Sequence, residues 1–223
     1  MRIKVAIART RSETLTCQRL IAEVYSGQYG VVFSSDRHDL DAKVEPWPHR
    51  YLMFSSEGKV LATFGLYVRD TYVERYGAVT DADVLRLLEE AGARDAYHPA
   101  RKRELTKLVV ANEARGLGLG LFVVAASHAR AFLQSETDEP QLLVTCSKRS
   151  LWTSLWQRVG IHTRVLKPFP RYKVHELFSS EEDPMDSRLI IPDRDIPRRW
   201  YDLEVPGEYV LDGELLAALG VQR

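Results

Sequence analysis

One stretch of the chain, residues 103 to 121, limits the possible folds more than any other. It reads RELTKLVVANEARGLGLGL, and its LTKLVVA portion predicts a strand because apolar and β-branched residues dominate it. Gly116, Gly118 and Gly120 alternate after this strand, and an apolar pattern with helical spacing begins at Leu121. Glycine lets the backbone approach a ligand closely, and the first turn of a helix offers N–H groups and a partial positive charge. The stretch therefore predicts a phosphate-binding turn between a strand and a helix.

This turn does not match two common nucleotide-binding loops. No Gly-Lys-Ser/Thr follows it, as a P-loop requires, and it lacks the Rossmann pattern G-x-G-x-x-G. The apolar runs 51–54 and 60–68, separated by SSEGK, predict an antiparallel hairpin instead of a βαβ unit. The sequence thus disfavours nucleotide hydrolysis and dehydrogenation.

Helix and strand patterns alternate through the rest of the chain. Thr10 with Glu13 forms a capping box before an amphipathic helix, and Thr80 with Asp83 marks the start of a second helix. We also expect strands at 3–8 and 141–146, a helix over 150–160, and strand-like runs with proline-rich turns from about 164. This order predicts an α/β fold.

Composition narrows the class of protein. Lys plus Arg equals Asp plus Glu at 31 each among 223 residues, so no overall basic field favours a nucleic-acid partner. The longest apolar run, 117–126, is shorter than the ~18 residues of a membrane span. Two cysteines and an amino terminus without a secretory apolar region lead us to expect a cytoplasmic protein. The histidines have no metal-ligand spacing, so we expect no metal.

The glycine turn resembles the acyl-CoA motif Arg/Gln-x-x-Gly-x-Gly/Ala of the GNAT acyltransferase superfamily, and the order of elements over 50–165 is similar too. The residues that carry the motif are Arg115, Gly116, Leu117, Gly118, Leu119 and Gly120. The resemblance implies a mixed, mostly antiparallel central sheet with helices on both faces. It implies an acyltransferase core at 1–165, with 166–223 completing the same domain. A simpler interpretation is that the glycines only permit tight packing of strand against helix.

Within the superfamily, ELTKLVV looks like the strand that a Glu opens in acyl-homoserine-lactone synthases and N-acyl amino acid synthases, and Glu104 holds that position. The acidic stretch with Asp36 and Asp39 is similar to the one those synthases place before their hairpin. Residues 200–215 weakly resemble thermostable-hemolysin-like proteins. The hairpin strand has FGLYV, with Gly65, where those synthases carry an arginine, which argues against homoserine-lactone chemistry itself.

The resemblance implies direct transfer of an acyl group from a thioester, of coenzyme A or an acyl carrier protein, to the amine of a small molecule such as an amino acid. The loop amides with Arg115 would hold the donor, and a main-chain N–H near Val109 or Val110 would polarise the thioester carbonyl. Glu104 would accept the proton of the amine, a role that suits a carboxylate whose pKa burial raises from about 4.3 towards 7. Asp36 and Asp39 would bind the acceptor.

Several alternatives remain at this stage. Glu104 follows the basic run RKR and could be a solvated charge, and the two aspartates could be solvated as well. Cys146 lies beside Lys148 and could carry the acyl group covalently, or be a small buried residue. Trp156 stands where many GNAT enzymes have a proton-donating Tyr, so a non-catalytic module that binds acyl-CoA is the other possible function.

Overall fold

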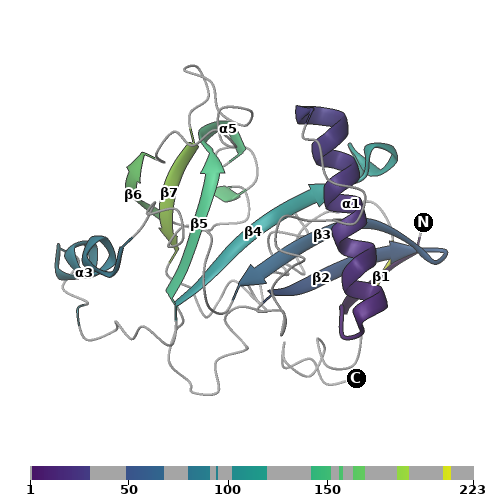
Figure 1. The fold of residues 1–223 in the computed structure, drawn as a ribbon, viewed down its shortest axis with the longest axis horizontal. Coiled ribbons are helices and arrows are strands. Elements are labelled where there is room, and N and C mark those ends of the chain that lie inside the picture. Colours follow the sequence, from purple (N-terminus) through teal and green to yellow (C-terminus); the bar gives the residue numbers. More distant parts are fainter. Residues whose placement is uncertain are drawn as a thin grey trace.

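A computed structural model of the chain describes residues 2–30, 49–67, 80–90, 94, 102–119, 142–151, 156–157, 163–168, 185–190 and 208–211. In this part of the chain, eight strands form one mixed sheet in the order β6-β7-β5-β4-β3-β2-β1-β8 (Figure 1). The strands are β1 (Arg2–Ile7), β2 (His49–Ser56), β3 (Lys59–Tyr67), β4 (Lys102–Val110), β5 (Leu142–Lys148), β6 (Thr163–Pro168), β7 (Met185–Ile190) and β8 (Glu208–Leu211).

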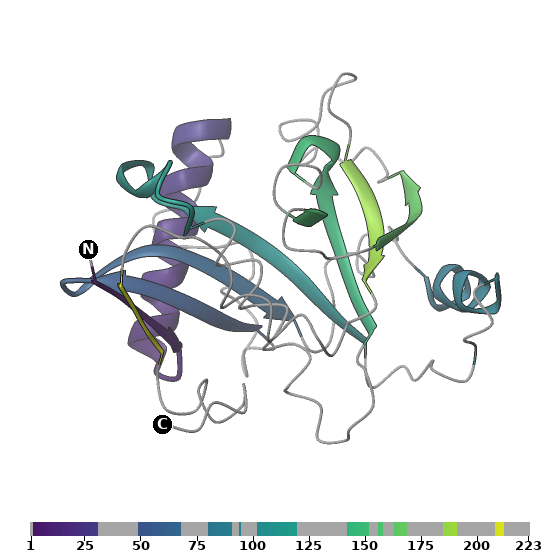
Figure 2. The same ribbon diagram turned by 180° about the vertical axis from the view of Figure 1, so that it is seen from behind.

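The sheet is mostly antiparallel, as predicted. β1, β2, β3 and β4 pair antiparallel in succession, and β7 pairs antiparallel with both β5 and β6. Two pairs are parallel: β4 with β5, and β1 with β8. The second parallel pair joins the last described strand to the first, and Figure 2 shows the two side by side at one edge of the sheet.

The first helix, α1 (Arg11–Tyr29), begins where the capping box predicts. The Thr10 hydroxyl accepts from the Glu13 amide at 3.2 Å, and the Glu13 carboxylate accepts from the Thr10 amide at 3.0 Å. The helix ends at Gly30, whose φ of 64° is left-handed. Both ends of α1 are therefore fixed by neighbouring residues.

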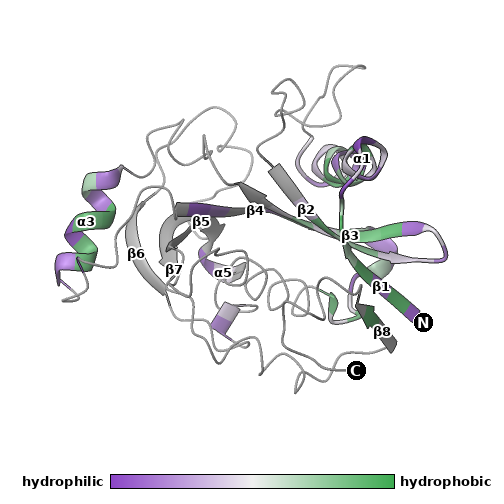
Figure 3. Cartoon of the chain, turned by 90° about the horizontal axis from the view of Figure 1, so that it is seen from below, coloured by the Kyte–Doolittle hydropathy of each residue, from purple (hydrophilic) through white to green (hydrophobic). Residues whose placement is uncertain are grey.

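α1 covers one face of the sheet, and Figure 3 shows the short α5 (Arg149–Leu151) on the opposite side. α1 packs against β2, β3 and β4 and buries Cys17, Ile21 and Val24. On the other face, Trp156 lies against Phe64 with ring centroids 6.2 Å apart. The hydrophobic core therefore has two layers, one on each side of the central strands.

Two further expectations hold and two lie outside the described residues. The β2–β3 hairpin turns through Glu57 (φ 50°) and Gly58 (φ 80°), as its SSEGK sequence predicts. Thr80 caps α3 (Asp81–Glu90), accepting from the Asp83 amide at 3.3 Å. The helix expected from 121 lies outside the described residues, and so does most of the helix expected over 150–160. No helix in the described part is both long and apolar enough to cross a bilayer.

Candidate functional site

The two central strands β4 and β5 pair over only part of their lengths. Their parallel register covers Lys102–Leu105 of β4 and Leu142–Thr145 of β5, although both strands continue further. Figure 1 shows the two strands diverging toward their carboxyl ends. Beyond Leu105, β5 therefore does not pair with the edge of β4 that faces it. A ligand can bond to main-chain groups at such an edge.

A bulge interrupts β4 just beyond this point. Thr63 pairs with Val109 but Gly65 pairs with Thr106, so β4 carries one extra residue between these pairs. Lys107 lies in the bulge with a φ of 56°, a left-handed conformation that is uncommon for a residue other than glycine. The sequence carries no turn signal within LTKLVV that would predict it.

The direction of the β4 amides distinguishes the two predicted carbonyl-binding donors. The Ala111 amide donates to the Leu61 carbonyl of β3 at 2.8 Å. Successive N–H groups of a strand point to opposite edges, so the Val110 amide points away from β3 and the Val109 amide points toward it. Of the two, Val110 directs its N–H to the edge of β4 from which β5 has diverged.

Glu104 lies on the face of the sheet that α1 covers. In the register, Glu104 pairs with Tyr67 of β3. Tyr67 and Thr63 are an even number of residues apart along β3, so Glu104 is on the same face of the sheet as Thr63. The Thr63 side chain is close enough to Cys17 of α1 to influence the pKa of its thiol, so Thr63 faces α1. Glu104 is only 1% exposed, so the alternative of a solvated surface charge is wrong. It lies one residue before the last paired position of β4 with β5.

The glycine loop follows β4 through a short 3₁₀ helix, η3 (Asn112–Ala114), which the sequence does not signal. Gly116 and Gly118 have φ values of 80° and 73°, which favour glycine. A Cβ atom added at Gly116 would have no atom within 4 Å. At Gly116, therefore, backbone conformation and not close packing accounts for the glycine. Leu119 is buried and Leu117 half-buried, so they fix the loop to the core.

Several predicted residues are not placed beside this site. Asp36, Asp39 and Gly120 lie outside the described residues. Cys146 is in β5, opposite Ser187 of β7 in the register. The other cysteine, Cys17, is buried on the side of α1 that faces the sheet, and burial raises the pKa of its thiol to about 11.

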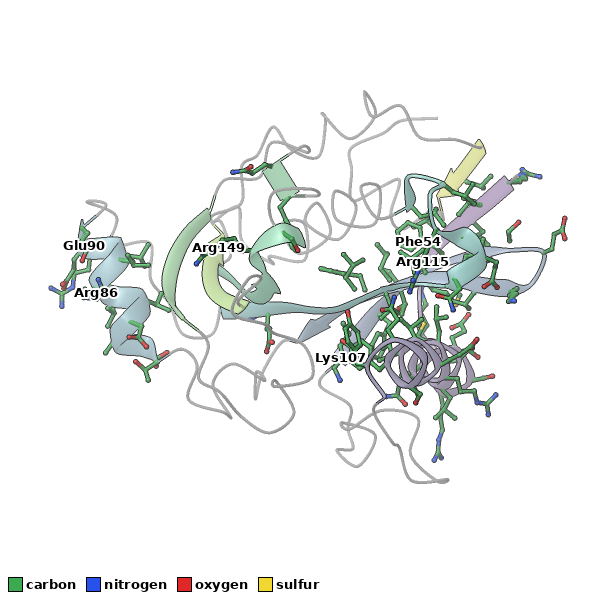
Figure 4. All side chains as sticks on the ribbon, turned by 90° about the horizontal axis from the view of Figure 1, so that it is seen from above. Phe54, Arg86, Glu90, Lys107, Arg115 and Arg149 are labelled. Atoms are coloured by element: carbon green, nitrogen blue, oxygen red, sulfur yellow. The ribbon has the colours of Figure 1, made fainter. Side chains whose placement is uncertain are left out.

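Two polar residues near the site have no counterpart in the sequence-based prediction. Lys107 is 8% exposed, and Gln18 in α1 is fully buried. Figure 4 shows Lys107 on the α1 side of β4, and Arg115 at the far end of that strand. The sequence held one signal for Gln18, which is a polar residue on the apolar face of a helix.

Other features of the described residues lie elsewhere. No group of three His, Cys, Asp or Glu among them could hold a metal ion. A groove of about 740 Å³ opens beside the first turns of α1, between β1 and the tip of the β2–β3 hairpin. It contains none of the predicted site residues, so we do not assign the acyl-transfer chemistry to it.

Comparison with known proteins gives a fold match and no sequence match. No family model matches the chain, and no curated protein matches it. A CoA-dependent acyl-homoserine lactone synthase, BjaI, solved with SAM and isopentyl-CoA, matches at a TM-score of 0.64 and 14% identity, covering 99% of each chain. The AHL synthase LasI matches at a TM-score of 0.56 and 14% identity, covering 93% of this chain and 96% of its own. FeeM, an N-acyl amino acid synthase from uncultured soil microbes, matches at a TM-score of 0.52 and 12% identity, covering 89% of this chain and 94% of its own.

These matches confirm the GNAT-like fold that the glycine motif led us to expect. The likeness to BjaI extends over nearly the whole chain, well beyond residues 50–165. At identities this low, the structural likeness establishes the fold alone.

Proposed function

We propose that the protein transfers an acyl group from a thioester, of coenzyme A or an acyl carrier protein, directly to the amine of a small molecule such as an amino acid. The observation that carries the proposal is a buried carboxylate, Glu104, next to the point where β4 and β5 diverge. The likeness to BjaI and FeeM supports it, because one is CoA-dependent and the other makes N-acyl amino acids.

The donor would be held at two places along its length. The backbone of 115–120, with its left-handed glycines, would bind the pyrophosphate, and Arg115 is an exposed cation beside it. The pantetheine arm would then run along the open edge of β4, where it can bond to main-chain groups. This path leads the thioester from the loop toward Val110 and the bulge.

The reaction itself is an addition followed by an elimination. The amine nitrogen attacks the carbonyl carbon of the thioester, and the new C–N bond places negative charge on the carbonyl oxygen. The Val110 amide donates to that oxygen, a stabilisation that grows as the charge develops. Collapse of the intermediate breaks the C–S bond and releases the thiolate.

Glu104 would receive the proton that the amine loses, directly or through a water molecule. The departing thiolate takes its proton from water, because the indole of Trp156 cannot supply one. Cys146 forms no covalent intermediate in this route. Asp36 and Asp39 remain our predicted contacts for the acceptor.

An activity assay tests this proposal. The purified protein is incubated with acyl-CoAs of several chain lengths and a pool of amino acids and amines, while a thiol reagent follows CoA release and mass spectrometry identifies acylated products. Amine-dependent thiol release with a matching N-acyl product supports transfer. A CoA-dependent rise in melting temperature without any product would instead support the alternative of a non-catalytic acyl-CoA-binding module.

A further inference from the structure

The groove of about 740 Å³ lies where α1 leaves part of the sheet uncovered. α1 packs against β2, β3 and β4, so in the described part of the chain this face of the sheet is open toward β1 and β8. One wall of the groove consists of Ser12, Glu13 and Thr16 of α1, and the other is the hairpin tip at 56–58. Sites for small molecules in proteins typically have volumes of about 300 to 1,000 Å³, so the groove has the size of such a site.

The strand register places the floor of the groove on one face of the sheet. Lys4 of β1 pairs with Ser55 of β2 on one side and with Val210 of β8 on the other. Ser55 also pairs with Val60 of β3. Paired residues point to the same face, and so does Met53, which is two residues from Ser55 along β2. All five line the groove, so its floor combines an ammonium and a hydroxyl with three apolar side chains.

Lys4 is the cation of the floor that can receive an anionic group. It forms no ion pair among the residues that the structure describes. The other cation of the groove, Arg2, has Glu208 opposite it in the register of β1 with β8. The two carboxylates of the groove, Glu13 and Glu57, belong to its walls. The Glu13 carboxylate already accepts from two main-chain amides at the start of α1, at 2.9 and 3.0 Å.

We propose that this groove binds a carboxylate that carries an apolar chain. The carboxylate accepts from the Lys4 ammonium and from the Ser55 hydroxyl. The chain covers Met53, Val60 and Val210, which removes apolar surface from water. This site is separate from the proposed acyl transfer, because none of the residues that we assign to that reaction lines the groove.

The methionines of the chain allow a direct test with octanoate as the probe. Met53 lines the groove, whereas Met185 begins β7, which three strands separate from β2 in the sheet. In protein labelled with ¹³C at the methionine methyl groups, octanoate should shift the NMR signal of Met53 and not that of Met185. Met53→Leu and Met185→Leu assign the two signals. A shift at Met185 alone, or at neither residue, would overturn the proposal.

A pair of variants tests the role of the cation. Lys4→Gln keeps a polar side chain of similar length but removes the charge, so the Kd for octanoate should rise about 10-fold. Arg19→Gln is the matched control, since Arg19 is an exposed cation of α1 that does not line the groove, and its Kd should equal that of wild type. Equal Kd values for wild type and Lys4→Gln would overturn the site.

Related probes test the class of ligand. Octanol has the chain without the charge and should bind at least about 10-fold more weakly than octanoate. Inorganic phosphate has charge without a chain and should leave the Met53 signal unshifted. From hexanoate to octanoate to decanoate, Kd should fall about 2- to 4-fold for each added CH₂. Equal binding of octanol would overturn the carboxylate, and phosphate that shifts Met53 as octanoate does would overturn the apolar chain.

Discussion

Lys59, the first residue of β3, forms an ion pair with Glu113 in η3, and so ties the tip of the β2–β3 hairpin to the turn that precedes the glycine loop. The pair raises the pKa of Lys59 and lowers that of Glu113. The main chain makes a second connection nearby, from the Ala111 amide to the Leu61 carbonyl. The hairpin thereby positions the loop that we assign to the donor.

We expect Lys59→Gln to weaken CoA binding a few-fold while moving the melting temperature little, because both partners of the ion pair are exposed to solvent. Arg86→Gln is the matched control, since it breaks an exposed ion pair of 2.8 Å with Glu90 in α3, away from the loop (Figure 4). Titration calorimetry measures the affinity of both variants for CoA, at low salt and at 1 M salt. Equal weakening by the two variants would show that the Lys59 ion pair does not position the loop.

The backbone conformation of the glycine loop leads to a second prediction. Gly118→Val should abolish the CoA-dependent rise in melting temperature, since a β-branched residue adopts a φ of 73° only at high cost and its side chain obstructs the approach of the pyrophosphate. Gly116→Asn should preserve the rise, because Asn tolerates a left-handed backbone and a Cβ there meets nothing within 4 Å. Circular dichroism checks that both variants fold. A normal rise with Gly118→Val would remove the loop from the donor site.

The thiol of Cys17 should be inert in the folded protein. It is fully buried and its pKa is about 11, so on the order of one thiol in a thousand is ionised at pH 8. In a Cys146→Ala background, iodoacetamide should leave the native chain unmodified and alkylate it in urea, as intact mass shows. The same variant should retain most acyl transfer, because Cys146 takes no part in the direct route. An acyl adduct on wild-type Cys146 would contradict that route.

The elements that the sequence predicts well are those whose signals lie within a few residues. Thr10 and Glu13 are three residues apart and satisfy each other, and the β2–β3 turn depends on Glu57 and Gly58 alone. These interactions form in the same way wherever the segment is placed. Local chemistry was therefore enough to locate the start of α1 and the hairpin.

The features that escaped prediction depend on distant partners. The β4 bulge exists because Thr106 and Val109 align with Gly65 and Thr63, a register set across two strands. The burial of Glu104 likewise arises from its central position in the sheet, although basic residues precede it in the sequence. The glycine motif was enough to predict the fold, but the environment of Glu104 could be seen only in the structure.

The stability of the protein should fall in acid partly because of Glu13. Hydrogen bonds from the amides of Thr10 and Arg9 lower the pKa of its carboxyl below 4.5 in the folded chain. The unfolded chain then binds the proton first as pH falls, so this contribution is complete above about pH 4.5 and is lost as pH drops through the folded pKa. Glu13→Gln should be less stable than wild type at pH 7, and the difference in urea midpoint should shrink by pH 3. A constant difference would contradict this.

Glu104→Gln tests the central step of the proposed reaction. The amide keeps the size of the buried side chain but cannot accept a proton, so kcat/KM should fall 10²- to 10⁴-fold, about 3 to 5 kcal/mol of barrier. CoA binding, measured by the rise in melting temperature, should be unchanged, because the glycine loop is intact. The acidic limb of the pH–rate profile should flatten, since the group that must be deprotonated is gone. A variant that melts as wild type does, binds CoA and retains full activity would exclude Glu104 as the base and leave the predicted aspartates, Asp36 and Asp39, or a bound water to fill that role.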